Sequence, residues 1–242
     1  MDPDELLARQ LQEKELRAQA QQPSMSDEET RKAEMLKHLE DALNKVKQAE
    51  DAESQALALS LMPLDDMRAA AHLMVALNPG PGPGTLACDD YLIRELATWF
   101  KTRFFSWVDA PPCGFCGANN PRGGAHMGTP TPEERSHGAG RVEVYTCSVC
   151  DQQTRFPRFN SQRKLLESRR GRCGEWANAF LLCCRAAGLD ARYVYDVTDH
   201  VWVEYWSGAM GRWVHADPCE VAVDKPLLYE VGWGKALSYV VA

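Results

Sequence analysis

The stretch Gly171-Arg172-Cys173-Gly174-Glu175-Trp176-Ala177-Asn178 places a cysteine where a turn becomes a helix. The helix-forming residues that follow continue to Ala187 and stop at Gly188. The unpaired N–H groups and the positive dipole end of a helix N-terminus favour a thiolate over a thiol. We therefore expect Cys173 to be reactive, whereas Cys183 and Cys184 lie mid-helix among apolar residues and fit an inert, buried role.

A histidine and an aspartate follow beside strand-like sequence, at His200 and Asp217. Cysteine, histidine and aspartate in this order indicate a nucleophile, its base and the group that orients the base. His215 is a competing base, but two residues along a strand span about 7 Å, too far for a tight pair with Asp217. We therefore expect His200 to be the base. The backbone N–H of Cys173 and the indole of Trp202 are candidate oxyanion donors.

Two C-x-x-C pairs form a second constellation, separated by 30 residues that are rich in Gly, Pro and polar side chains. Each pair lets a tight turn present two thiolates, and two pairs complete a tetrahedral site with no position left for water. Structural Zn²⁺ is the favoured ion; an Fe–S cluster is the alternative, and a redox dithiol would explain only one pair. The expected ligands are Cys113, Cys116, Cys147 and Cys150.

The chain divides by composition. Residues 1–60 are rich in Glu, Gln, Lys, Ala and Leu, lack glycine, and predict a helical arm that breaks near Pro23. Residues 61–87 end in a Pro/Gly run that predicts a linker, and all seven tryptophans follow in residues 88–242. We expect that last part to be an α+β core, a helix packed on an antiparallel sheet, with a metal-binding insert at 113–150. Its predicted elements are an amphipathic helix over 90–107 and strands over 192–197, 201–206 and 212–216.

Charge excludes several functions. The net charge is −7, and residues 1–60 hold 14 acidic and 8 basic side chains, so that the rest of the chain is nearly neutral. Without a basic stripe we expect no nucleic-acid partner.

No segment has the roughly 20 apolar residues that cross a bilayer, and the acidic N-terminus does not resemble a signal peptide. We expect a cytoplasmic protein, with the nucleus as a further location, and no membrane insertion.

Several motifs resemble the cytoplasmic peptide:N-glycanases of the transglutaminase-like superfamily. The Cys-His-Asp trio alone would also fit transglutaminases and cysteine proteases. Both C-x-x-C pairs, together with Asp217-Pro-Cys-Glu220 and Gly232-Trp-Gly-Lys235, narrow the resemblance to glycanases. The other matching segments are Trp99–Lys101, Phe104–Trp107, Gly171–Asn178, Ala191–Val194, Asp199–Trp202, Arg212–His215 and the whole of Asp224–Lys235.

This resemblance implies a transglutaminase-like (papain-like) core over roughly residues 88–242. It implies hydrolysis of the amide between N-acetylglucosamine and asparagine in misfolded N-glycoproteins, through a thioester on Cys173, as part of glycoprotein degradation. Glu220, Trp233 and Lys235 match positions that the family uses around the chitobiose core. Family members continue beyond the position of Ala242, so the resemblance also implies a C-terminally truncated core. From the sequence we also expect no N-terminal domain of the kind with which animal members bind a AAA ATPase.

The N-terminal arm has a second resemblance, to ubiquitin-interacting helices. Residues 4–13 resemble an inverted motif, and residues 50–61 resemble the forward motif with Ala56 and Ser60 on one helical face, although no apolar residue stands at position 53. A small alanine lets a helix approach a flat apolar patch. Ubiquitin or a proteasome-shuttle protein is therefore an expected partner. A transglutaminase or protease, or a non-catalytic module that binds ubiquitin or glycoproteins, remains the alternative function.

Overall fold

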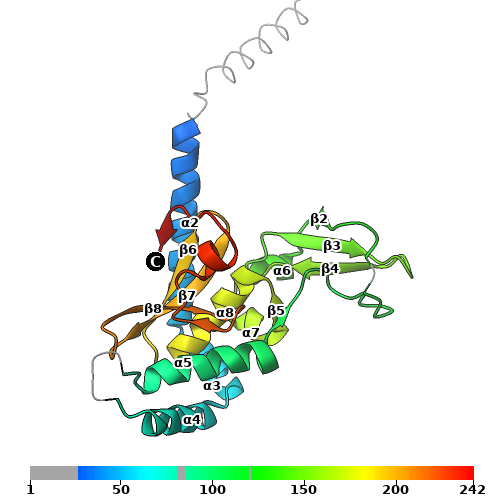
Figure 1. The fold of residues 1–242 in the computed structure, drawn as a ribbon. Helices are drawn as coiled ribbons and strands as arrows, with labels where there is room; N and C mark the ends of the chain where they lie inside the picture. Colours follow the sequence, from blue (N-terminus) through cyan, green and yellow to red (C-terminus); the bar gives the residue numbers. More distant parts are fainter. Residues whose placement is uncertain (1–26, 81–84, 120) are drawn as a thin grey trace, which may run out of the picture. The chain divides into compact units, whose positions relative to one another are not determined.

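The computed structural model describes residues 27–80, 85–119 and 121–242 (Figure 1). The motif-like segment at 4–13 and the helix break expected near Pro23 lie outside these residues. The chain divides into two units, Met1–Asp41 and Ala42–Ala242. Helix α2 (Asp27–Ala49) contains the described part of the first unit, and everything that follows belongs to the second.

One central helix organises the second unit. Helix α8 (Cys173–Ala186) carries apolar residues on almost every side, and ten of its residues are buried, as expected for a helix inside a core. It packs against strands β6 and β7 and against helices α3, α5 and α7. The other helices are α3 (Ala52–Leu61), α4 (Leu64–Leu77), α5 (Cys88–Trp99), α6 (Pro132–Ser136) and α7 (Gln162–Ser168), with π-turns η1 (Phe100–Phe104) and η2 (Leu228–Gly232).

A five-stranded antiparallel sheet lies against α8, with strand order β10-β6-β7-β8-β9. The helix on an antiparallel sheet and the three strands expected at 192–197, 201–206 and 212–216 are confirmed. Val203 pairs with Ala216, so the start of β7 and the end of β8 lie at the same edge of the sheet. The strands are β6 (Ala191–Asp196), β7 (His200–Ser207), β8 (Arg212–Asp217), β9 (Ala222–Val223) and β10 (Val240–Val241).

The insert expected at 113–150 contributes β2 and β3 to a separate antiparallel sheet of order β2-β3-β4, and this sheet continues through β4 to Pro157, beyond the expected bound. The name insert is used below for residues 113–157. A separate parallel pair, β1 with β5, joins the segment after η1 to the two residues just before the N-cap of α8. The strands are β1 (Ser106–Trp107), β2 (His126–Gly128), β3 (Val142–Thr146), β4 (Gln153–Pro157) and β5 (Arg170–Gly171).

The helix predicted over 90–107 is shorter than expected. Its α-helical part ends at Trp99, and the backbone N–H of Phe105 then bonds to the carbonyl of Phe100, one residue further back than in an α-helix. The extra residue lets Phe100, Phe104 and Phe105 all enter the core, where Phe100 stacks on Phe105 and meets Trp176 and Phe180 edge to face. Aromatic packing, which a helical periodicity cannot reveal, therefore ends this helix.

The segment 61–87 also differs from a simple linker. Leu64–Leu77 forms α4, whose Leu64, Met67 and Ala71 are buried and which packs on α5. The helix ends at Asn78, where the Pro/Gly run begins. The first half of this segment is thus part of the fold, because its apolar residues recur at helical spacing.

Candidate active site

Cys173 is the first residue of α8, and the preceding turn holds it there. The backbone N–H of Arg172, the N-cap, donates a 2.9 Å hydrogen bond to the Glu175 carboxylate, which closes the first turn. A side chain at Gly171 would place its Cβ 2.3 Å from that of Glu175, so this position requires glycine. The half-buried thiol therefore lies at the positive end of a buried helix, as the sequence predicts.

His200 is the first residue of β7, and the structure brings it to both predicted partners. Its Nε2 lies 3.1 Å from Oδ2 of Asp217, and Cys173 is close enough to raise the pKa of the same imidazole. Burial lowers the pKa of His200, but the hydrogen bonds and charges of Asp217 and Cys173 outweigh it and raise the pKa to about 9. The imidazole is therefore held as the cation beside the thiol.

Asp217 is fully buried at the end of β8. Its Oδ1 accepts a 2.8 Å hydrogen bond from the backbone N–H of Cys219, and its Oδ2 accepts one from the Tyr229 hydroxyl at 2.7 Å. Burial raises the pKa of Asp217, whereas the bonds from His200 and Tyr229 lower it, and the result lies below the ordinary value. The carboxylate thus remains charged and fixes the orientation of His200.

His215 reaches the same carboxylate through an intermediary that the sequence does not indicate. Its Nε2 lies 2.7 Å from the hydroxyl of Tyr229, which donates its only proton to Asp217. His215 must therefore donate from Nε2, which fixes the neutral tautomer, and burial keeps its pKa below the ordinary value. As expected from the distance along the strand, His215 is not hydrogen-bonded directly to Asp217. It is linked to that carboxylate through the Tyr229 hydroxyl.

The three expected substrate contacts occupy different surroundings. The ring of Trp233 meets that of His200 edge to face, with centroids 4.9 Å apart, and the side chain is 47% exposed. The ammonium of Lys235 lies 3.3 Å from Oδ2 of the buried Asp196, which also binds Thr198 in the turn before His200. Glu220 lines a cavity of about 250 Å³; its other lining residues are Lys101, Trp107, Trp176 and Cys219.

That cavity is a feature the sequence did not locate. Trp107 and Trp176 provide aromatic surface, while Glu220 and the ammonium of Lys101 provide hydrogen-bonding groups of opposite charge. Lys101 donates to the carbonyl of Cys219, two residues after Asp217. Through Cys219 the cavity is thus only two residues from Asp217 along the chain. The motif segments around residues 99–107 and 171–178 contain its aromatic residues, but only the fold brings them together.

Two further expectations concern the mid-helix cysteines of α8 and the indole of Trp202. Cys183 and Cys184 are completely buried, and burial raises the pKa of Cys183 to about 12, as expected of inert thiols. Buried Nε1 of Trp202 has no hydrogen-bond partner among the described residues, and the proposed oxyanion role of this indole stays a prediction.

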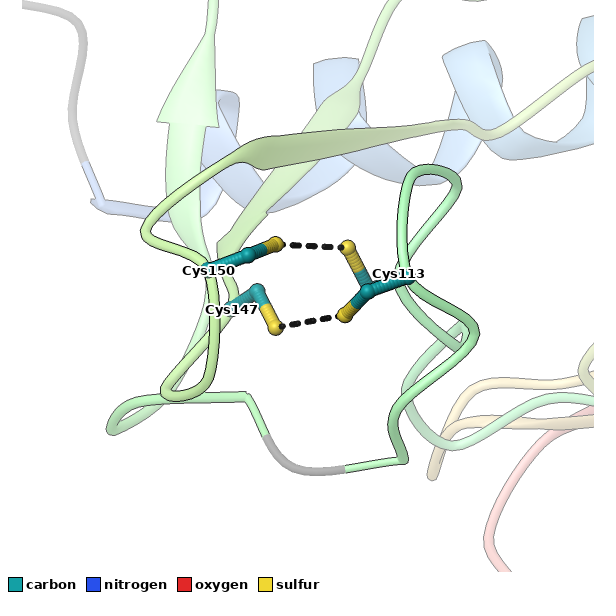
Figure 2. A group of neighbouring side chains, drawn as sticks. Cys113, Cys147 and Cys150 are labelled. Carbon is teal, nitrogen blue, oxygen red and sulfur yellow. Dashed lines mark hydrogen bonds between the residues drawn. The ribbon is translucent and has the colours of Figure 1, made fainter.

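The four predicted metal ligands come together at one end of the insert. Figure 2 shows their side chains converging from two loops, and all four sulfur atoms lie within 4.8 Å of one another. The Sγ atoms of Cys113 and Cys150 are 3.5 Å apart, and those of Cys116 and Cys147 are 3.6 Å apart. A tetrahedral ion with bonds of roughly 2.3 Å to sulfur requires separations of about 3.8 Å. The sulfur atoms therefore fit a single metal ion.

The two loops have the same backbone geometry. In each, the N–H of the first cysteine bonds to the carbonyl five residues on, and its carbonyl accepts from the N–H four residues on. The fourth residue after the first cysteine, Gly117 or Asp151, has φ of +73° or +57°. Backbone N–H groups of Cys116 and Phe115 lower the pKa of Cys113 to about 6. Both turns thus point their sulfur atoms at a shared centre.

Within the described residues, no helix has the length and apolar character needed to cross a membrane.

A model of the transglutaminase-like superfamily matches residues 126–218, which include Cys173, His200 and Asp217. The chain is 50% identical over 194 residues to the peptide-N(4)-(N-acetyl-beta-glucosaminyl)asparagine amidase of Gallus gallus, covering 80% of this chain and 30% of that protein. It is 44% identical over 239 residues to the protein of the same name from Oryza sativa subsp. japonica, covering 99% and 52%. The corresponding Homo sapiens protein is 46% identical over 189 residues, covering 78% and 29%. The chain thus spans about half or less of the length of these relatives.

Proposed function

The chain belongs to the peptide:N-glycanase family of the transglutaminase-like superfamily, and on this premise we propose that it hydrolyses the N-acetylglucosaminyl-asparagine amide of N-linked glycoproteins. The observation that carries the proposal is the 3.1 Å pair of His200 with Asp217, with Cys173 close enough to raise the pKa of the same imidazole. This arrangement provides a nucleophile, a proton donor and a fixed carboxylate for acyl transfer.

The reaction starts with the Cys173 thiolate, which attacks the side-chain carbonyl of the glycosylated asparagine. As the tetrahedral intermediate collapses, the C–N bond breaks and the His200 imidazolium gives its proton to the departing glycosylamine, leaving a thioester on Cys173. Neutral His200 then takes a proton from water, which attacks the thioester. The thiolate departs, and the asparagine has become aspartate.

Recognition of the sugar is assigned to the groups around the triad. Glu220 and the tryptophans of its cavity offer a carboxylate and aromatic faces, a pairing that suits the hydroxyl groups and C–H faces of N-acetylglucosamine. Trp233 extends this surface across His200. Lys235 is proposed to contact the glycan with the part of its ammonium that Asp196 does not cover.

The metal is proposed to be Zn²⁺ in a structural role. Its ligands would be the four insert cysteines, which leave no coordination position for a substrate. When bound, the ion would hold the two loops together at the base of the insert.

Substrates are proposed to be misfolded N-glycoproteins met in the cytoplasm, with the nucleus as a further location. Ubiquitin is a second proposed partner, because Ala56 and Ser60, the small residues of the motif-like face on α3, are both exposed. Titration of labelled ubiquitin with the chain should shift ubiquitin amide signals, and Ala56→Gln should weaken this effect. Unchanged signals with the wild type would remove this partner.

The activity is tested by incubating the chain with a denatured N-glycoprotein. Free glycan and conversion of the glycosylated asparagine to aspartate are expected from the wild type and from Cys88→Ala, whose thiol lies outside the triad and the metal cluster. Cys173→Ala should release none. Peptide cleavage or lysine cross-linking in place of glycan release would favour the protease or transglutaminase alternative. Equal release by Cys173→Ala would overturn the assignment.

A further inference from the structure

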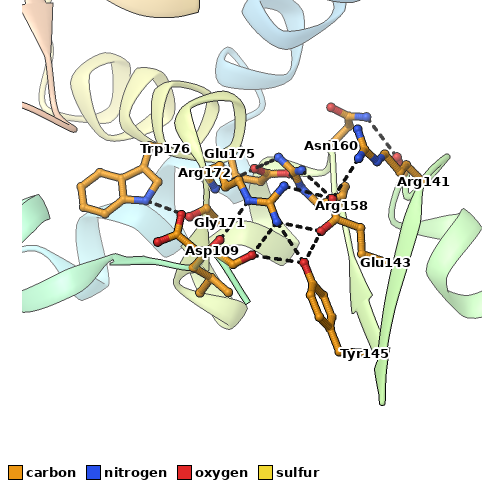
Figure 3. A network of polar contacts seen from close by, with 12 residues as sticks. Asp109, Arg141, Glu143, Tyr145, Arg158, Asn160, Gly171, Arg172, Glu175 and Trp176 are labelled. Carbon is orange, nitrogen blue, oxygen red and sulfur yellow. Dashed lines mark hydrogen bonds and ion pairs between the residues drawn. The ribbon is translucent and has the colours of Figure 1, made fainter. Parts of the chain in front are cut away.

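A buried carboxylate of the insert binds the residue next to the nucleophile. Glu143, on β3, is 2% exposed and accepts a forked pair of hydrogen bonds from Arg172, at 3.1 Å from Nη1 to Oε1 and 2.7 Å from Nη2 to Oε2 (Figure 3). The Tyr145 hydroxyl donates to the same Oε2 at 2.6 Å, and Arg158 donates to Oε1 at 3.2 Å. Burial raises the pKa of Glu143, but the bonds from Arg172 and Tyr145 lower it to about 2. This carboxylate is therefore ionised at neutral pH.

Arg172 connects three parts of the fold through one guanidinium group. Besides the fork to Glu143, its Nε donates to the carbonyl of Val108 at 3.0 Å and its Nη2 donates to that of Asp109 at 2.7 Å. Its own backbone forms the N-cap of α8. The residue that caps the helix of Cys173 is therefore held by its side chain to Glu143 and to the segment after β1.

A second fork holds the other side of the same turn. Arg158, which follows β4 of the insert, binds Glu175 with Nε to Oε1 at 2.6 Å and Nη2 to Oε2 at 2.7 Å. Glu175 in turn accepts the backbone N–H of Arg172. Two arginine–carboxylate forks thus join the insert to the first turn of α8, and such forks fix both distance and direction.

We propose that Glu143 is a positioning residue for the nucleophile: it holds Arg172 so that the Cys173 thiol faces His200, and it thereby makes the geometry of the active site depend on the metal-bearing insert. The part of this proposal that is tested by turnover rests on the proposed function. The reactivity of the Cys173 thiol toward an alkylating agent measures the same positioning without any glycan.

The chain provides a matched control. Glu134, on α6 of the insert, also has a pKa of about 2, and it binds Arg155 in a fork at 2.9 and 2.6 Å. Both partners of that pair lie within the insert, so Glu134→Gln removes an insert fork without touching α8. Glu143→Gln removes the fork that leads to Cys173 and keeps the shape of the side chain.

The experiment compares both variants with the wild type by three measurements: bound metal, the rate at which iodoacetamide modifies Cys173 as followed by peptide mass spectrometry, and the kinetics of glycopeptide hydrolysis. Glu143→Gln is expected to keep its metal, to alkylate more slowly at Cys173, and to lower kcat by about tenfold or more while KM stays within about twofold. Glu134→Gln is expected to match the wild type in all three.

Arg172→Lys is a second variant that removes the same fork, and it shows whether the effect of Glu143→Gln is more than a folding defect. It keeps the backbone cap and the positive charge but cannot form the fork, so it should reproduce the fall in kcat, and the double variant should be no worse than either single one. Wild-type alkylation and kcat in Glu143→Gln would overturn the proposal, as would equal losses in Glu134→Gln. A wild type that alkylates rapidly but releases no glycan would contradict the proposed function alone, and the comparison of alkylation rates would still decide the role of Glu143.

Discussion

Tyr229 donates a 2.7 Å hydrogen bond to Oδ2 of Asp217, the same oxygen that lies 3.1 Å from Nε2 of His200. A residue of the η2 turn thereby takes part in orienting the Asp217 carboxylate. The Tyr229 side chain is fully buried, and its hydroxyl also accepts a hydrogen bond from His215. His200, Asp217, Tyr229 and His215 therefore form one buried series of hydrogen-bonded side chains.

Replacing Tyr229 with phenylalanine should destabilise the protein. The change removes one bond to Asp217 and leaves the buried Nε2–H of His215 without its acceptor, at a cost of about 1–3 kcal/mol in the free energy of unfolding. Urea denaturation followed by tryptophan fluorescence measures this loss. Tyr239→Phe, at a side chain that is 74% exposed, serves as the control and should leave the unfolding curve unchanged. An unaltered midpoint for Tyr229→Phe would contradict the hydrogen-bonded chain.

Activity should fall at alkaline pH when His200 loses its proton. The pKa of His200 is raised from 6.5 to about 9, so the imidazolium that is the proposed proton donor persists through neutral pH and disappears as pH rises through about 9. By linkage, its contribution to folding is complete below pH 6.5 and is lost over the same rise to about 9.

The Asp217→Asn variant tests the cause of that shift. Without the carboxylate, the alkaline limb of the kcat/KM profile should move toward neutral pH, and kcat should drop by about a thousandfold or more. Asp224→Asn removes an aspartate whose partner is Arg212 rather than His200, and the alkaline limb of its kcat/KM profile should not move. If Asp217→Asn also leaves the alkaline limb unchanged, a group other than His200 determines the loss of activity at high pH.

Two neighbouring glycines should respond in opposite directions to alanine. At Gly171 the added Cβ would lie 2.3 Å from that of Glu175, so Gly171→Ala should cost about 1–3 kcal/mol through overpacking. At Gly174 no heavy atom lies within 4 Å of the new Cβ, and the residue is helical, so alanine should stabilise by roughly 0.5–1 kcal/mol. Thermal unfolding of both variants decides this, and equal shifts would refute the close approach at Gly171.

Loss of a metal ligand should remove the bound ion and lower the thermal stability of the protein. Purified protein should contain about one zinc ion per chain, and Cys116→Ser or Cys147→Ser should lose the ion and lower Tm, because four thiolates are needed to close the site. Cys88→Ser keeps all four ligands and should retain the ion. Stoichiometric iron, or no metal in the wild type, would contradict the zinc assignment.

The sequence was most informative where the signal is local. Cys173 at a helix start and the alternating strands that carry His200 and Asp217 are patterns of a few residues, and the structure has each element in its expected place. The two C-x-x-C pairs were equally predictive, since a short turn determines how both thiols point.

What the sequence could not show depends on contacts between distant segments. The link from Tyr229 to Asp217 and the fork from Glu143 to Arg172 join residues that are 12 and 29 positions apart, on elements whose relative placement follows only from the packed core. The early end of α5 has the same origin, because the aromatic contacts of Phe100 and Phe105 with Trp176 override helical periodicity.

The proposed nucleophile is the Cys173 sulfur, which would attack the amide carbonyl of a glycosylated asparagine. The most direct measurement uses a glycopeptide in heavy-oxygen water, with acid-quenched samples analysed by mass spectrometry. We predict a peptide thioester on Cys173 at early times and a product aspartate that carries one heavy oxygen, with both signals absent in Cys173→Ala. Labelled aspartate formed by Cys173→Ala, or formed without any adduct at Cys173 in the wild type under conditions that trap thioesters, would contradict the account.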